Sequence, residues 1–152
     1  MPSINVTQKS AIVYFTTPDG VNLCGADGSV VALSANANIP ELVGTPLSAL
    51  PTDAQLLAVV LQGQPDGGVC VGALVGMYAG LLKAQLADSA GTVNVGTPMT
   101  INASGLWKVA SSGETVYARA IHAQWEPGYC EIAFVPSYTI PSENQSESSS
   151  ES

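Results

Sequence analysis

Short runs of β-branched and aromatic residues recur along the chain, separated by clusters of glycine, proline, aspartate, asparagine and serine. This alternation is typical of β-strands joined by tight turns. Strands are predicted on this basis at residues 11–17, 28–34, 55–62, 69–75, 106–110, 115–124 and 128–135. Several short strands of this kind predict an all-β fold, built as a small barrel or sandwich.

Two segments are harder to assign. The leucines of residues 78–91 could form one face of a helix, yet every second residue from Leu82 to Leu86 is apolar, and this alternation favours a strand. Residues 35–54 contain three prolines, which predicts a loop with one short helical turn near Ser48.

One stretch of the chain is present in two related copies. Residues 58–75 match residues 118–135, and within them LQGQPDGGVCVGALV aligns with IHAQWEPGYCEIAFV without a gap. A Gly-Thr-Pro triplet lies upstream of both copies, at 44–46 and 96–98, at spacings that indicate loops of different length. The alternative is a chance similarity between two β sequences.

Each copy of this repeat predicts a β-hairpin with an acidic, glycine-containing turn. Gly68 and Gly128 are expected to supply the left-handed backbone conformation of the two turns. Two related hairpins that face each other would close a small barrel, with Cys70 and Cys130 at equivalent inward positions. The repeat is therefore predicted to be the unit from which the fold is built.

The ends of the chain differ in composition from this β region. Ile4 and Val6 alternate with polar neighbours, a pattern suited to a strand that joins the sheet edge of another subunit. The last residues are rich in serine and glutamate, and they cannot bury enough apolar surface to fold alone. The predicted division is an N-terminal arm (1–10), a β domain (11–135) and a C-terminal tail (136–152).

Large side chains outside the predicted core are candidates for contact with a partner. Trp125 stands where the first copy of the repeat has Pro65, and Tyr129 replaces Val69, so only the second hairpin tip is aromatic. A structural role as a cap on the fold is the alternative for these two residues. The predicted partner contacts are Ile4, Val6, Trp125, Tyr129, Tyr138 and Ile140.

Charge and composition narrow the classes of partner. Twelve acidic against four basic side chains give a net charge of −8, which would repel a nucleic-acid backbone. Charged residues make up 11% of the chain, whereas a soluble domain carries about 25%, so much of the surface is expected to face other protein. The longest weakly polar run, 69–82, is too short and too rich in glycine to cross a membrane. The opening residues lack a basic region followed by an apolar one, so synthesis in the cytoplasm is expected.

Candidate catalytic chemistry is sparse. Cys24, Cys70 and Cys130 match no zinc-binding spacing and are expected to be buried, reduced thiols. His122 is the only histidine, and a small hydrolase would need it to act with Asp66 or Glu126 across the fold. A solvated or hydrogen-bonded imidazole is the commoner role for such a residue. We therefore expect no enzymatic activity, no metal and no cofactor.

The segment AGTVNVGTPMTINASGLWKVASSGETVYARAIHAQ, residues 90–124, resembles a pattern of turns and strands in the small capsid decoration, or cement, proteins of tailed bacteriophages. The resemblance extends over about residues 58–135. Two features depart from the family: the segment 35–54 is longer than its usual loop, and the serine-glutamate tail is unfamiliar.

This resemblance implies a structural virion protein without catalytic residues. Such a protein would bind the outer surface of the capsid, reinforce the joints between major capsid proteins, and form a trimer or another small oligomer. The alternative is a β-sandwich module that binds glycans or a cell-surface partner, with Trp107, Trp125 and Tyr129 as its stacking platform.

Overall fold

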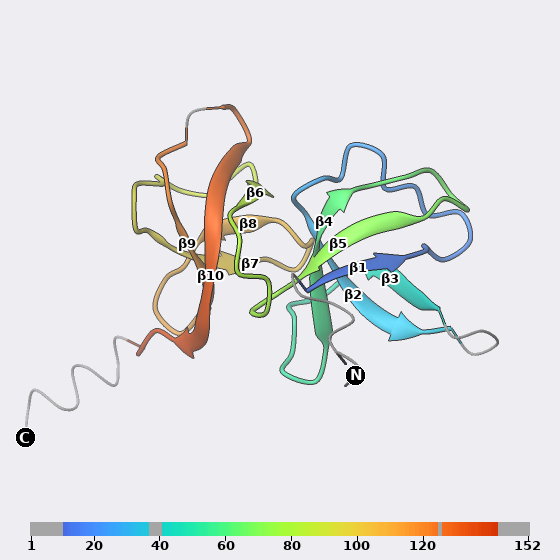
Figure 1. Cartoon of the computed structure of the whole chain (residues 1–152). Coiled ribbons are helices and arrows are strands. Elements are labelled where there is room, and N and C mark those ends of the chain that lie inside the picture. Colours follow the sequence, from blue (N-terminus) through green and yellow to red (C-terminus); the bar gives the residue numbers. More distant parts are fainter. Residues whose placement is uncertain (1–10, 37–40, 125, 143–152) are drawn as a thin grey trace, which may run out of the picture.

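A computed structural model describes residues 11–36, 41–124 and 126–142 of the chain. Ten β-strands form two antiparallel five-stranded sheets, which lie next to each other (Figure 1), and the described residues contain no helix. The strands are β1 (Ile12–Phe15), β2 (Val30–Ala35), β3 (Leu42–Pro46), β4 (Leu56–Gln62), β5 (Cys70–Leu74), β6 (Leu82–Gln85), β7 (Pro98–Ile101), β8 (Trp107–Val109), β9 (Thr115–Ala120) and β10 (Tyr129–Thr139). The predicted all-β fold is confirmed.

Both sheets have the same topology. The strand order is β1-β5-β4-β2-β3 in the N-terminal half and β6-β10-β9-β7-β8 in the C-terminal half, so each strand has a counterpart five strands later. The pairing register also matches: Ala58 is opposite Leu74 in the first hairpin, and Ala118 is opposite Phe134 in the second. The predicted repeat is therefore confirmed, and the duplication includes all five strands of each half.

Hydrogen bonds show which residues upstream of the two hairpins are equivalent, and they differ from the sequence alignment. The Gly28 amide donates to the Val60 carbonyl over 2.7 Å, and the Gly96 amide donates to the Ala120 carbonyl over the same distance. Gly28 is thus the counterpart of Gly96, whereas the triplet that begins at Gly44 lies in β3. The Gly-Thr-Pro match reflected residue identity without structural equivalence.

The hairpin turns also differ from the prediction in detail. Gly128 has the expected positive φ, +83°, but in the first turn Gly67, with φ +84°, takes this role in place of Gly68. The two hairpins lie in separate sheets and do not pair with each other. Within each sheet the outermost strands meet at one isolated parallel bridge, Thr16 to Val43 and Leu86 to Trp107.

Strand boundaries agree with the sequence pattern except at the short strands β3 and β7 and at the end of β10. The segment 78–91 contains the strand β6, as favoured, but the segment predicted as a loop contains β3, and β7 was not predicted. Strand β10 continues to Thr139, so residues 136–139 belong to the sheet, beyond the predicted domain boundary at 135. A register shift between Phe134 and Tyr138 accommodates this extension.

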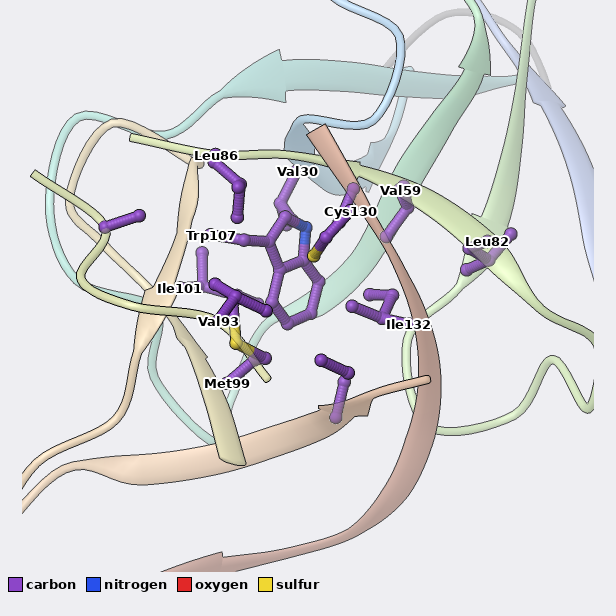
Figure 2. Packing of buried hydrophobic residues seen from close by; sticks show 14 of the residues in the cluster. Val30, Val59, Leu82, Leu86, Val93, Met99, Ile101, Trp107, Cys130 and Ile132 are labelled. Carbon is purple, nitrogen blue, oxygen red and sulfur yellow. The ribbon is translucent and has the colours of Figure 1, made fainter. Parts of the chain in front are cut away.

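The larger hydrophobic core is shared between the halves. Val30, Leu57, Val59 and Ala73 of the N-terminal half pack in one cluster with buried side chains of the C-terminal half, among them Trp107. Figure 2 shows the Trp107 indole with Val30 on one side and Ile101, Met99, Ile132 and Cys130 around it. Because a second, smaller cluster covers the other face, the N-terminal sheet is buried on both sides. This two-sided burial explains the continuous apolar run in β4.

Main-chain contacts hold the two halves together at a docking seam, which we define as the contact of residues 28–30 with β6 and the β7–β8 turn. The Gln85 amide donates to the Gly28 carbonyl over 3.0 Å, and the Val30 amide donates to the Gly105 carbonyl over 2.8 Å. A Cβ atom at Gly28 would lie only 2.6 Å from the Gln85 nitrogen, so this approach requires glycine. Val30 is buried at this seam, with 1% of its surface exposed.

Candidate interaction surfaces

The predicted partner contacts do not form one patch. Ile4, Val6 and Trp125 lie outside the described residues. Tyr129 and Tyr138 are near opposite ends of β10, about 30 Å apart at the usual rise of a strand. No single contact surface can therefore include both tyrosines without covering most of the sheet.

Intramolecular contacts hold both tyrosines in place. The Lys83 ammonium lies 4.2 Å from the centroid of the Tyr129 ring and 3.4 Å from a carboxylate oxygen of Glu126. The Tyr138 hydroxyl accepts a hydrogen bond from the Arg119 guanidinium over 3.0 Å, and its side chain is 40% exposed. Both rings are therefore ordered by neighbours within the chain.

Ile140 is also tied to the fold. Its amide donates to the Glu114 carbonyl, and its carbonyl accepts from the Gly113 amide. The side chain is half-buried, which leaves little of it for a partner.

Residues from both sheets line an inter-sheet cleft of about 360 Å³ that the sequence did not reveal. Its lining residues are Thr52, Asp53, Gln55, Leu56, Leu57, Val75, Gly76, Met77, Tyr117, Val135, Pro136 and Ser137. Met77 is 61% exposed and Leu56 is 39% exposed, although both are large apolar side chains. Their exposure leaves apolar area at the mouth of the cleft available to a partner.

A smaller hollow of about 140 Å³ adjoins this cleft, because Tyr117 lines both. Leu50, which is 63% exposed, lies at the hollow beside Pro51. Burial and the nearby charge of Asp53 raise the pKa of the Tyr117 phenol, so the phenol stays neutral in this poorly solvated setting. Leu50 and Met77 were a usable sequence signal, since both are large apolar residues placed in the connections between strands.

The second open surface is the β1–β3 groove of the N-terminal half, a hollow of about 360 Å³. Its lining residues are Val13, Tyr14, Phe15, Thr16, Glu41, Leu42 and Val69. Tyr14 is 63% exposed and Val69 is 57% exposed, whereas Phe15 forms the buried floor. The groove is thus an apolar slot with one carboxylate at its rim.

The charges are unevenly distributed between the halves. Lys83, Lys108 and Arg119, the basic residues of the described chain, all lie on strands of the C-terminal sheet. Lys83 and Lys108 pair with carboxylates, whereas the guanidinium of Arg119 donates to the Gly96 carbonyl over 2.9 Å and to Tyr138. The described N-terminal half carries acidic side chains without a basic one.

The grouping that a small hydrolase would need around His122 was not the favoured interpretation, and each of its three residues contacts another partner. The His122 imidazole lies 3.3 Å from Glu131, whereas Asp66 accepts from the Gly20 amide and Glu126 pairs with Lys83. Across residues 11–36, 41–124 and 126–142, no group of three or more histidine, cysteine, aspartate or glutamate side chains could hold a metal ion.

Two further predictions can be compared with burial. Cys70 and Cys130 are buried free thiols, as expected, but Cys24 is exposed. Trp107 is fully buried at the centre of the core, so it cannot belong to a glycan-stacking platform. The glycan-binding alternative thereby loses one of its three aromatic residues.

Comparison with known proteins adds no relative: no family model matches the chain, and no curated protein matches it. In the part of the chain that the structure describes, no helix is long and apolar enough to cross a membrane.

Proposed function

We propose that the chain is a capsid decoration protein of a tailed bacteriophage, which binds the outer surface of the shell and stabilises it. The family resemblance of residues 58–135 suggested this role. The observation that carries the proposal is the inter-sheet cleft, where Met77, Leu56 and the adjoining Leu50 are exposed on an otherwise charge-poor protein.

The cleft has the properties of a docking site for another protein. A large apolar side chain contributes about 1.5 to 3 kcal/mol when it becomes fully buried, so these three side chains can supply the central contacts of an interface. Among the described residues, Asp53 is the only charged one that lines the cleft. A partner with an apolar ridge and few acidic groups fits this surface.

The protein would stabilise the shell through the free energy of binding alone, without catalysing a reaction. An interface of ordinary size provides about −8 to −12 kcal/mol per bound copy. Repeated over a shell, such contacts tie neighbouring major capsid proteins together and resist pressure from inside. The duplicated fold supports this role because its halves share one core, which lets the protein act as a rigid clamp.

The proposal also includes the partners of the protein and the place where it acts. The partners are the major capsid protein and other copies of this chain, in a trimer or another small oligomer. Nucleic acid is disfavoured as a partner by the net charge of −8. The protein would be made in the host cytoplasm, act outside any membrane, and need no catalytic residue or cofactor.

The test uses shells of the phage that encodes the chain, assembled without it. Wild-type protein should bind the shells saturably and raise their resistance to heat, and Met77→Glu should weaken binding at least tenfold because it places a charge in the apolar contact. Val95→Glu is the matched control, because Val95 is 74% exposed and lines neither the cleft nor the groove. Equal binding by the two variants, or no binding by the wild-type protein, would refute the proposal.

A further inference from the structure

At the docking seam, residues 28–30 of the N-terminal half contact β6 and the β7–β8 turn of the C-terminal half. The β1–β3 groove is the equivalent surface of the N-terminal half. Tyr14 pairs with Val71 across β1 and β5 in the same way that Lys83 pairs with Glu131 across β6 and β10. Val69 precedes Cys70 as Tyr129 precedes Cys130. The duplication therefore identifies the groove as a place where a polypeptide segment can dock.

Residues 28–30 dock at one of these two places through hydrogen bonds to Gln85 and Gly105, whereas no segment of the described chain docks at the other. In the C-terminal half, Val30 and Val59 of the other half pack into the shared core and are 1% and 0% exposed. In the N-terminal half, Tyr14 and Val69 at the groove remain 63% and 57% exposed. The groove is thus an apolar site whose occupant has to come from outside residues 11–36, 41–124 and 126–142.

The C-terminal sheet of a second copy cannot dock in the groove in the way that residues 28–30 dock at the seam. The counterpart of the segment Gly28 to Val30 is Gly96 to Pro98, and Pro98 has no amide hydrogen to donate. The carbonyl of Gly96 is already engaged by Arg119. The groove must take a different segment.

Residues 1–10 have the chemistry that the groove requires. Ile4 and Val6 alternate with polar residues, and the segment contains Lys9 and no acidic side chain, which complements Glu41 at the groove rim. β1 and β3 are the outermost strands of their sheet, and Thr16 already bonds to Leu42 and Gly44 across them, so an added segment would bind through its apolar side chains. Ten extended residues span about 33 Å, more than the length of the groove-forming strands.

We propose that the β1–β3 groove binds residues 1–10 of a second copy of this chain. The segment joins the fold at Ala11, whose carbonyl accepts from the Leu74 amide, at the end of β1 opposite to Thr16. Ala11 has a left-handed backbone conformation, φ +57°, so the chain changes direction where the segment leaves β1. Sedimentation therefore has to distinguish a neighbour's groove from the segment's own groove.

Each subunit then donates one segment and accepts another, which closes a small ring of subunits. This inference goes beyond capsid binding and does not depend on it, since every measurement below uses the protein alone. Its failure would leave the capsid proposal untouched.

The test combines an arm variant, Ile4→Asp with Val6→Asp, and a groove variant, Val69→Glu. Sedimentation should show that the wild-type protein associates and that the dissociation constant of each variant rises at least tenfold. A mixture of the two variants should form a one-to-one complex, because one retains the groove and the other retains the arm. The controls are Ser3→Asp with Asn5→Asp, on the polar positions of the arm, and Val95→Glu; both should associate like the wild-type protein.

A peptide of residues 1–10 provides a second measurement that does not require the groove variant to fold. It should bind the arm variant, and the same peptide with aspartate at positions 4 and 6 should bind at least tenfold more weakly. A monomeric wild-type protein, a mixture that fails to associate, or equal binding of the two peptides would each overturn the proposal.

Discussion

Large and small side chains exchange places between the two halves. Phe15 in β1 is the counterpart of Ala84 in β6, since they pair with Cys70 and Cys130. Trp107 in β8 is the counterpart of Gly44 in β3, since they pair with the equivalent residues Ile101 and Leu33. Each half therefore fills its interior with one large aromatic ring, but from opposite outer strands.

Gly44→Ala tests this exchange, because a Cβ atom at Gly44 would collide with the Phe15 ring. Phe15 is 2% exposed and has little room to move, so we expect the free energy of unfolding to fall by about 1 to 3 kcal/mol, the usual cost of overpacking. Urea denaturation measures the change. In a Phe15→Leu background the cost of Gly44→Ala should shrink by at least about 0.5 kcal/mol; strictly additive effects would contradict the exchange.

The Cys130 thiol makes stability depend on alkaline pH. Burial raises its pKa to about 11, from an ordinary value of 9.0. The contribution is fully present below pH 9 and is lost as the pH rises towards 11, because the unfolded state loses its proton first. The free energy of unfolding should fall by up to about 2.7 kcal/mol over this range. Denaturation curves of the wild-type protein and Cys130→Ala between pH 8 and 11 should differ in slope, and parallel slopes would rule out this role.

At the scale of the strands, the hairpin repeat could be predicted from the sequence. Its two copies share both the identity of buried side chains and the backbone requirements of the turns. The matched cysteines are fully buried in both halves, where few other residues fit, so the correspondence survives in the sequence. The turn between β4 and β5 was placed one residue late because Gly67 and Gly68 are adjacent, and only the backbone conformation distinguishes them.

The strands β3 and β7 were not predicted from the sequence for a related reason. β3 ends at Pro46 and β7 begins at Pro98, and a proline inside a short apolar run normally argues against a strand. Both prolines are tolerated because they stand at the end of a strand. Where each strand ends, which the sequence pattern did not show, decided the outcome.

The two candidate surfaces depend on long-range packing and could not be predicted. The inter-sheet cleft combines residues of β4, β9 and β10 with two turns, and these converge only when the halves dock. The groove could be interpreted only after hydrogen bonds had established which residues are counterparts. Conversely, the aromatic hairpin tip suggested a contact at Tyr129, but that ring packs against Lys83.

For the whole molecule, the duplication raises the question of why docking stops after two halves. The outward face of the N-terminal sheet presents Val30 and Val59 to its neighbour, whereas the counterpart positions of the C-terminal sheet carry Pro98 and Arg119. We expect these two residues, one charged and one without an amide hydrogen, to end the array after two units.

Replacing both residues should remove this limit. We expect Arg119→Val combined with Pro98→Val to associate head to tail beyond the wild-type oligomer, because a heterologous contact that does not close continues without limit. Light scattering should then increase with protein concentration without reaching a plateau. Arg119→Lys with Pro98 retained is the charged control, and a double variant of unchanged size would show that other features end the array.

The uneven placement of basic residues gives the molecule a permanent electric dipole. The described N-terminal half carries five acidic residues and no basic one, whereas the described C-terminal half carries four acidic and three basic residues. The contacts discussed above act only after two surfaces touch, but a dipole exerts a torque before contact. Salt screens this torque over about 8 Å at physiological ionic strength. It can therefore orient the molecule only in the last step of approach, when one half is turned towards a charged surface and the other away from it.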